Sequence, residues 1–300
     1  MATTTVESAS TAPLQAAAHG DRDSRSLVFL GLLWGSLAFG IFALGVLLVN
    51  TFIEGSGRLD LMLFVNYTSQ LFPGKAGARA AILGSLMVIV VTALLAVPLG
   101  VAAASYLEEF ASRENRFARF VELNVQNLAA VPAIIYGMLA AGLAVTVGLP
   151  RNTVLVGAIA LALLILPVII VSTREALRAV PREIRQGSLA LGATPMQTLT
   201  RQTLPAAIPG IATGTILALS RAMGEAAPLL LLGGLVFVTY DPNGLLSGFT
   251  TMPIQIFDWA GRSQIAFREL AAAASMVLLV LVLAMNAVAI IIRNKFTTSR

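Results

Sequence analysis

The sequence predicts an all-α, polytopic membrane protein with six transmembrane helices. Of its 300 residues, 57% are hydrophobic and only 12% are charged, whereas a soluble domain carries about 25% charged residues. The mean hydropathy is +0.85. The apolar residues are gathered into long runs that are separated by polar segments. Composition and segmentation together indicate a chain that crosses a bilayer repeatedly.

Six apolar runs are long enough for the hydrocarbon core of a bilayer, which needs about 20 helical residues. We expect spans at 27–52, 80–106, 120–147, 153–173, 208–240 and 270–292. Pro209, Gly210, Gly224 and Pro228 predict kinks or a half-helix in the long fifth run. The spans form one domain, 27–293, between a tail at 1–26 that is predicted to be disordered and a short tail at 294–300.

The positive charges predict the orientation of the chain. With the N-terminus inside, roughly twice as many Lys and Arg residues lie in the inner segments as in the outer ones, and such residues concentrate on the cytoplasmic side. Both termini are therefore predicted to be cytoplasmic. The polar segment 174–206, between the fourth and fifth spans, is predicted to lie on the same side.

Missing residue types exclude several kinds of chemistry. The chain has no cysteine and one histidine, His19 in the N-terminal tail, which excludes disulfides, thiol nucleophiles and Cys/His zinc sites. The nucleotide-binding pattern G-x-x-x-x-G-K-[ST] does not occur, so ATP hydrolysis would belong to another chain. We expect a protein that is not an enzyme and binds no cofactor or metal of its own.

The polar segment contains a turn that local rules predict. Pro195 suits the first position of a helix, Thr194 precedes it as an N-cap, and Gln197 completes a capping box. Gly192 provides the backbone freedom that a tight turn often needs. The pattern predicts a helix, a tight turn and a short helix that leads into the fifth span. Arg-rich helix–turn–helix patterns also bind DNA, but spans on both sides leave no independent domain, so no nucleic-acid partner is expected.

This segment resembles the loop through which type I ABC importer permeases, which have the MetI-like fold, contact their ATPases. The family pattern is E-A-A-x-x-x-G-x9-I-x-L-P, and Gly192, Leu204 and Pro205 keep its spacing. Gln186-Gly187-Ser188 replaces Glu-Ala-Ala, Gln202 replaces Ile, and Glu183, nearly one turn earlier, is a candidate substitute for the missing acid. The resemblance implies contacts with an ATPase through Glu183, Gln186, Gly187, Ser188, Gly192, Ala193, Thr194, Pro195, Leu204 and Pro205.

An ion-coupled secondary carrier is the alternative class of protein. It would also have broken helices and charges within the membrane, but the internal repeats of carriers are not evident in this sequence.

Three further strings narrow the resemblance. ALSRAMGEAAPLL (218–230), NLAAVPAIIYG (127–137) and MPIQIFDWA (252–260) are similar to strings of the PstA subfamily of phosphate importer permeases. The resemblance implies a subunit that forms half of a pathway for inorganic phosphate across a bacterial cytoplasmic (inner) membrane. The implied partners are a PstC-like permease, two PstB-like ATPase subunits and a periplasmic or lipid-anchored phosphate-binding protein. Charge and spacing do not select phosphate over sulfate or another oxyanion.

Four residues are candidates for the substrate pathway. Arg221 and Glu225 are the ionisable residues deep in a predicted span, and they lie four apart on one helix face. An unpaired charge at the bilayer centre costs about 2.5–3.5 kcal/mol, so the two form a structural ion pair, a weak phosphate site whose carboxylate favours release, or both. Asn127 and Tyr136 either bind phosphate oxygens or tie helices together.

Two charge clusters lie at the predicted cytoplasmic ends of spans. Arg174, Arg178, Arg182 and Arg185 follow the fourth span and are either the positive-inside signal or a basic face toward an ATPase. Glu108 and Glu109 end the second span and are predicted to be solvated.

Overall fold

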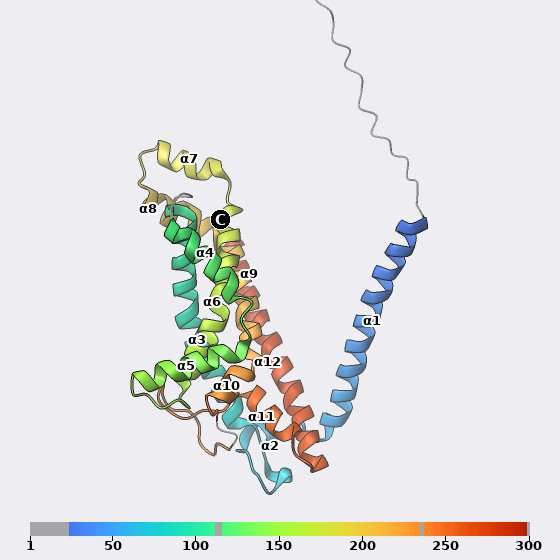
Figure 1. Ribbon diagram of the computed structural model, residues 1–300. Coiled ribbons are helices and arrows are strands. Elements are labelled where there is room, and N and C mark those ends of the chain that lie inside the picture. The colour runs from blue at the N-terminus through green and yellow to red at the C-terminus, as the bar shows by residue number, and fades with distance from the viewer. Residues whose placement is uncertain (1–23, 112–115, 235–236, 299–300) are drawn as a thin grey trace, which may run out of the picture. The chain divides into compact units, whose positions relative to one another are not determined.

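The computed structural model describes residues 24–111, 116–234 and 237–298 (Figure 1). The chain divides into two compact units, Met1–Val49 and Asn50–Arg300. The first unit holds most of helix α1, Ser24–Gly55. Nearly all α1 side chains between 27 and 49 are exposed and most are apolar, which suits a helix surrounded by lipid. The predicted N-terminal tail lies outside the described residues up to residue 23.

The described residues of the second unit form helices joined by loops, with one isolated β-bridge between Thr153 and Gly248. Its helices are α2 (Leu61–Val65), α3 (Arg79–Ser105), α4 (Arg116–Leu128), α5 (Ala133–Thr146), α6 (Val154–Arg178), α7 (Arg182–Ala190), α8 (Pro195–Thr198), α9 (Leu204–Met223), α10 (Ala227–Leu231), α11 (Met252–Ala260) and α12 (Ile265–Thr298). Short 3-10 turns cover Ser56–Arg58 and Pro73–Lys75, and π-helical segments cover Tyr106–Phe110 and Leu199–Thr203. The first π segment continues α3, and the second joins α8 to α9 without a break.

Five helical segments in the described part of the chain are long and apolar enough to cross a membrane. They are Leu27–Arg58, Arg79–Phe110, Val154–Arg178, Pro195–Met223 and Ile265–Ile291. These segments correspond to the first, second, fourth, fifth and sixth predicted spans. Helix α12 continues to Thr298, so the first residues of the predicted C-terminal tail are helical.

The prediction of one continuous third span at 120–147 is wrong. The segment is divided between α4 and α5, with a break at 129–132. Pro132 is the N-cap of α5 and has extended backbone, with φ −55° and ψ 134°, and a proline disfavours helical conformation in the residue before it. Figure 1 shows α5 lying across the end of α4 rather than continuing it. Only α5 is apolar throughout, and it is shorter than a span.

The predicted fifth span also ends earlier than expected. Helix α9 stops at Met223, Gly224 caps it, and the short helix α10 follows. Pro209 lies inside α9 without ending it. The half-helix expected in this run is therefore α10, and residues 232–234 and 237–240 are not helical.

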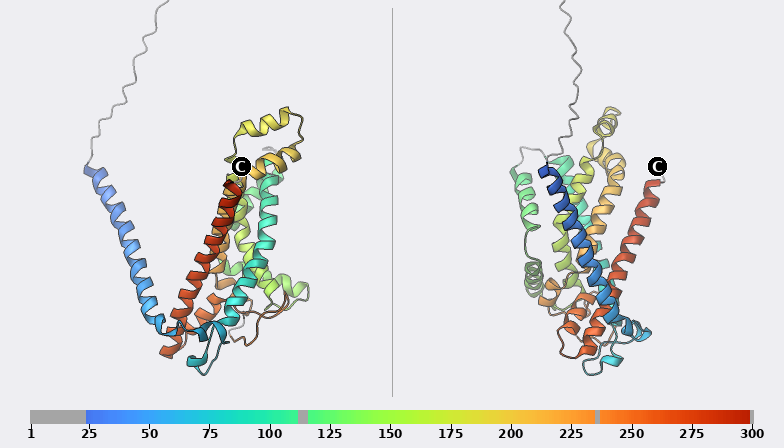
Figure 2. Two further views of the ribbon diagram at one scale, coloured as in Figure 1. Left: turned by 180° about the vertical axis from the view of Figure 1, so that it is seen from behind. Right: turned by 90° about the vertical axis from the view of Figure 1, so that its right-hand side faces the viewer.

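Helices α3, α6 and α9 pack side by side at the centre of the second unit (Figures 1 and 2). Small residues allow close approach, as is common between membrane helices. A Cβ added to Gly100 of α3 would lie 2.6 Å from Ile169 Cγ2 of α6, and one added to Gly214 of α9 would lie 2.3 Å from Ser172 Oγ. The bundle therefore depends on glycine at both crossings. Helices α2 and α11 lie toward one end of the second unit, and α7 and α8 lie at the other (Figure 1).

Candidate coupling and transport site

The turn between α7 and α8 has the local structure that the sequence predicts. Gly192 has φ +84°, in the left-handed region that favours glycine. The Thr194 hydroxyl accepts a hydrogen bond from Gln197 N at 3.3 Å, and the Gln197 carboxamide oxygen accepts one from Thr194 N at 2.9 Å. Pro195 occupies the first position of α8. The predicted capping box and glycine turn are confirmed.

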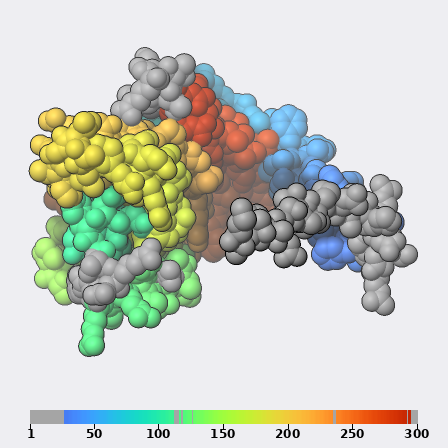
Figure 3. All heavy atoms as spheres, turned by 90° about the horizontal axis from the view of Figure 1, so that it is seen from above, coloured from blue at the N-terminus to red at the C-terminus, as the bar shows by residue number. Residues whose placement is uncertain are grey.

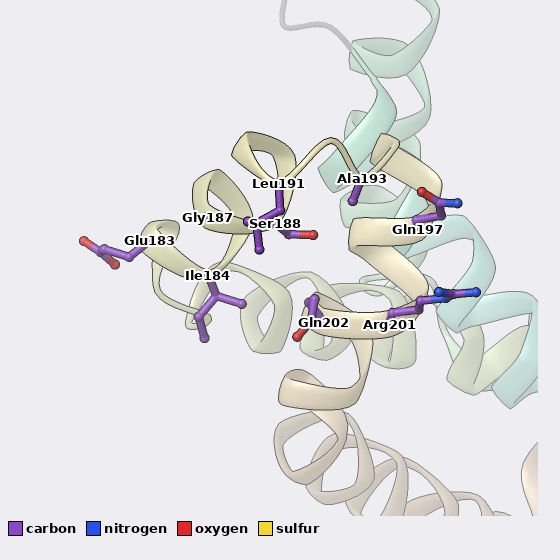
Figure 4. Close-up of a pocket in the computed structure, with 9 residues that line it drawn as sticks. All are labelled: Glu183, Ile184, Gly187, Ser188, Leu191, Ala193, Gln197, Arg201 and Gln202. Carbon is purple, nitrogen blue, oxygen red and sulfur yellow. The ribbon is translucent and has the colours of Figure 1, made fainter.

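A hollow of about 470 Å³ lies between α7 and the segment that runs from α8 into the second π segment (Figure 4). Its lining residues come from both sides of the turn: Glu183, Ile184, Gly187, Ser188, Leu191, Ala193, Gln197, Arg201 and Gln202. The hydroxyls of Ser188 and Thr198 lie 2.9 Å apart and connect α7 to α8. Leu191 is 91% exposed and Met196 is 59% exposed. Leu191 lies outside the five apolar segments and Met196 lies in the first turn of one of them; exposed apolar side chains beside a hollow suit contact with a protein partner.

Figure 3, viewed onto this end of the second unit, shows α7 and α8 in yellow and orange forming an outer part of its surface. Leu204 and Pro205 begin α9 directly after the π segment. Helical structure therefore runs from Pro195 to Met223. Arg221 lies near the far end of this continuous helical segment, which we call the rod.

A network of ion pairs joins the π segment after α3, the middle of α4 and the end of α6. Glu108 accepts from Arg174 Nε at 3.2 Å and from Arg178 Nε at 2.9 Å, and Arg174 Nη1 reaches Glu122 of α4 at 2.8 Å. Glu175 completes the network with Arg178 at 3.2 Å. Only 12% of the Arg174 side chain and 15% of the Glu108 side chain are exposed. The prediction that Glu108 is solvated is wrong.

Glu109 makes a separate ion pair with α7. Its Oε1 lies 2.8 Å from Arg185 Nη2 of α7, and the two side chains are 17% and 23% exposed. The prediction that Glu109 is solvated is also wrong. Sequence reasoning treated the acids and the Arg cluster separately, although both fall on the same predicted side of the membrane. Opposite charges at two neighbouring span ends were the signal that pointed to this pairing.

Glu183, the candidate substitute for the missing family acid, is exposed. Its carboxylate points away from the hollow in Figure 4. No ion pair of Glu183 is found among the described residues. Gln186 and Gly187 are also exposed on α7.

The two charged pathway candidates lie together at the end of α9. Arg221 Nε is 3.4 Å from Glu225 Oε1, and the side chains are 57% and 23% exposed. Thr213, Leu217, Arg221 and Gly224 share the exposed face of this helix. Arg221 is thus both paired and open, which fits a structural ion pair and an anion site equally.

The two uncharged candidates differ in their surroundings. Asn127 is exposed near the end of α4. Tyr136 is buried in α5, with 4% of its surface exposed, and its hydroxyl donates to Leu128 O across the break between the helices. The tyrosine proton is therefore already used to join α4 to α5.

The two strings that contain these candidates meet in space. A Cβ on Gly137 of α5 would lie 2.4 Å from Pro228 O of α10, so the backbones touch. In the third string, Met252, Ile254 and Trp259 of α11 are fully buried. The described residues contain no group of three or more His, Cys, Asp or Glu side chains that could hold a metal ion.

Residues 96–297 match the model of the family described as "Binding-protein-dependent transport system inner membrane component". The chain belongs to this family. It is accordingly a multi-pass transport subunit of an inner membrane.

Two relatives that are named as transporter permeases align with most of the chain. The chain is 31% identical to the phosphate transport system permease protein PstA of Pasteurella multocida (strain Pm70) over 88% of its length and 93% of the relative's. It is 33% identical to the probable ABC transporter permease protein YqgI of Bacillus subtilis (strain 168), covering 74% of this chain and 78% of the relative.

The fold is also similar to that of a solved transporter. A chain from inward-facing conformations of the MetNI methionine ABC transporter superposes with a TM-score of 0.56 and 22% identity, covering 73% of this chain and 95% of that one. This likeness confirms the predicted MetI-like fold.

Proposed function

We propose that this chain is the permease subunit of an ATP-driven importer and forms half of the pathway for inorganic phosphate across the inner membrane. The proposal gives it a PstC-like permease partner, two PstB-like ATPase subunits and a periplasmic or lipid-anchored phosphate-binding protein. ATP is hydrolysed by the separate ATPase chains. Support comes from the relatives named as PstA, which align over nearly the whole chain.

The observation that carries the pathway assignment is the exposed Arg221 paired with Glu225 at the end of α9. A guanidinium group matches the geometry of a tetrahedral oxyanion. The carboxylate at 3.4 Å competes with the anion and keeps it from being held tightly, as conduction requires. Asn127 and Tyr136 are proposed as neighbouring parts of this pathway, on helices that lead to the packed contact between Gly137 and Pro228.

Coupling is assigned to the turn between α7 and α8. Its exposed Leu191 and Met196 offer apolar anchors, and the glycine turn and capping box fix their arrangement. On ATP binding the ATPase subunits close and move this turn, and the rod from α8 through α9 carries the movement to Arg221. The positive charges near these segments support a cytoplasmic location for the turn and for both termini.

Uptake of phosphate by proteoliposomes containing the four kinds of subunit tests the proposal. ATP-dependent uptake that unlabelled phosphate, but not sulfate, abolishes is the expected result. Uptake competed equally by sulfate would assign a broader oxyanion substrate. Absence of phosphate uptake by the assembled complex would refute the substrate assignment.

A further inference from the structure

We infer that Glu109 is a positioning residue for the coupling helix, and that its ion pair with Arg185 joins α7 to the end of α3. The inference rests on the proposed coupling role of α7. It adds a second connection between the turn and the bundle, besides the rod from α8 into α9. The movement of α7 is thereby passed to α3 as well as to α9.

Helix α7 has few other contacts that hold it in place. None of its residues is buried, and the hollow of about 470 Å³ separates part of it from α8 and the following π segment. Two of its side chains reach other helices: Ser188 contacts Thr198 of α8, and Arg185 contacts the ends of α3 and α6. A helix without an apolar core contact depends on such polar contacts for its position.

Arg185 connects α7 to two other helices at once. Its Nη2 lies 2.8 Å from Glu109 Oε1 on the π segment that ends α3. The same nitrogen donates to Leu177 O of α6 at 2.6 Å. The contact with Glu109 is a close charge pair without hydrogen-bond geometry, and the hydrogen bond of this nitrogen goes to Leu177 O, so the end of α3, the end of α6 and the middle of α7 meet at one side chain.

Two adjacent acids of the π segment, Glu108 and Glu109, pair with different helices. Glu108 pairs with Arg174 and Arg178 of α6, whereas Glu109 pairs with Arg185 of α7. Single π turns inside helices are often found at functional sites. Glu108 therefore fixes α3 against α6, and Glu109 links that fixed pair to the helix that receives the ATPase.

The partial burial of this pair makes the connection hard to open. The two side chains are about four-fifths hidden from solvent, and removing one partner from a buried pair leaves an uncompensated charge. An exposed ion pair would break and re-form with little effect. The joint between α3 and α7 is accordingly expected to persist while the ATPases move α7.

The test compares Glu109→Gln and Arg185→Gln with wild type in the reconstituted complex, by the number of ATP molecules hydrolysed per phosphate transported. We expect both variants to assemble and to hydrolyse ATP. Their phosphate uptake should fall by a factor of about 5–150, which is the change that typical coupling free energies produce. The double variant should lose no more than either single variant, because the two residues act as one joint.

A matched control separates coupling from general damage. Asp258→Asn removes one partner of the Asp258–Arg262 ion pair, whose 2.8 Å distance and side-chain exposures of 20% and 22% are close to those of the Glu109–Arg185 pair, but which lies outside the proposed coupling segment. This variant should keep the wild-type ratio of ATP to phosphate. A wild-type ratio in Glu109→Gln, or an equal rise in Asp258→Asn, would overturn the inference.

Should Glu109→Gln fail to assemble, Arg185→Met replaces it, because methionine keeps a long unbranched side chain but has neither the charge that faces Glu109 nor the donor that reaches Leu177 O. A raised ratio in that variant supports the joint, and a wild-type ratio overturns it. If wild type itself takes up no phosphate, the proposed substrate fails. The stimulation of ATP hydrolysis by the loaded binding protein then still reports on the joint.

Discussion

Replacing Gly192 by alanine isolates the backbone geometry of the coupling turn. Gly192 has φ +84°, and an added Cβ would meet no atom within 4 Å. The substitution therefore introduces no clash, and its cost is that of placing an L-residue in the left-handed region, about 1–2 kcal/mol. That cost favours other conformations of the turn by a factor of up to about 5–30.

This conformational free-energy cost should weaken the binding of the ATPase to the permease. When only a fraction of the protein has the binding-competent conformation, the apparent Kd rises by the inverse of that fraction. We expect the Kd of purified ATPase subunits for proteoliposomes bearing the permease pair to rise by up to about 5–30-fold in Gly192→Ala. A β-branched residue should cost more, so Gly192→Val is expected to lose both transport and stimulation of ATP hydrolysis.

Gly142→Ala is the matched control for this measurement. Gly142 also has open space where a Cβ would be added, but it lies inside α5 with helical backbone, where alanine is favoured over glycine by about 1 kcal/mol. Because α5 is outside the segment proposed to contact the ATPase, the affinity of this variant for the ATPase should equal that of wild type. Equal affinities in Gly192→Ala and Gly142→Ala would refute the assigned role of the positive φ.

Two further predictions concern the helices around the pathway. Tyr136→Phe removes the hydroxyl that donates to Leu128 O, and we expect the free energy of unfolding to fall by about 1 kcal/mol; an unchanged free energy of unfolding would contradict this. Ser85→Ala removes the acceptor of a buried bond from Met252 N at 2.8 Å, and the unpaired amide should cost about 1–3 kcal/mol. Thermal unfolding of the purified complex measures this loss, and an unchanged midpoint would contradict it.

The fold class and the coupling turn could be predicted because both depend on local information. Long apolar runs identify membrane helices without reference to the rest of the chain. The capping box of Thr194 and Gln197 and the turn at Gly192 likewise depend on neighbouring residues only.

The broken third span could not be recognised from hydropathy. Apolar residues on both sides of the break fill a window of span length, so the break at Pro132 is hidden. The proline was visible in the sequence, but prolines are tolerated inside membrane helices, and α9 does contain one at Pro209. Only the packed structure shows which proline ends a helix.

The ion pairs of Glu108 and Glu109 depend on which helix ends become neighbours. Their partners, Arg174, Arg178 and Arg185, are more than sixty residues away. The packing of α3 against α6 brings these charges together. The positions of the acids and the Arg residues along the chain indicated that both lie on the same side of the membrane. Which acid pairs with which Arg residue is determined by how the helices pack.

The central claim is that Arg221 takes part in moving phosphate, and phosphate uptake by Arg221→Gln proteoliposomes tests it most directly. Arg262→Gln is the control, because Arg262 and Asp258 form an ion pair with the same four-residue spacing on α11 and the residues after it. Phosphate uptake per assembled complex should fall at least about tenfold in Arg221→Gln, which is equivalent to about 1.4 kcal/mol. The uptake of Arg262→Gln should remain near that of wild type. Wild-type uptake by an assembled Arg221→Gln complex would contradict the claim.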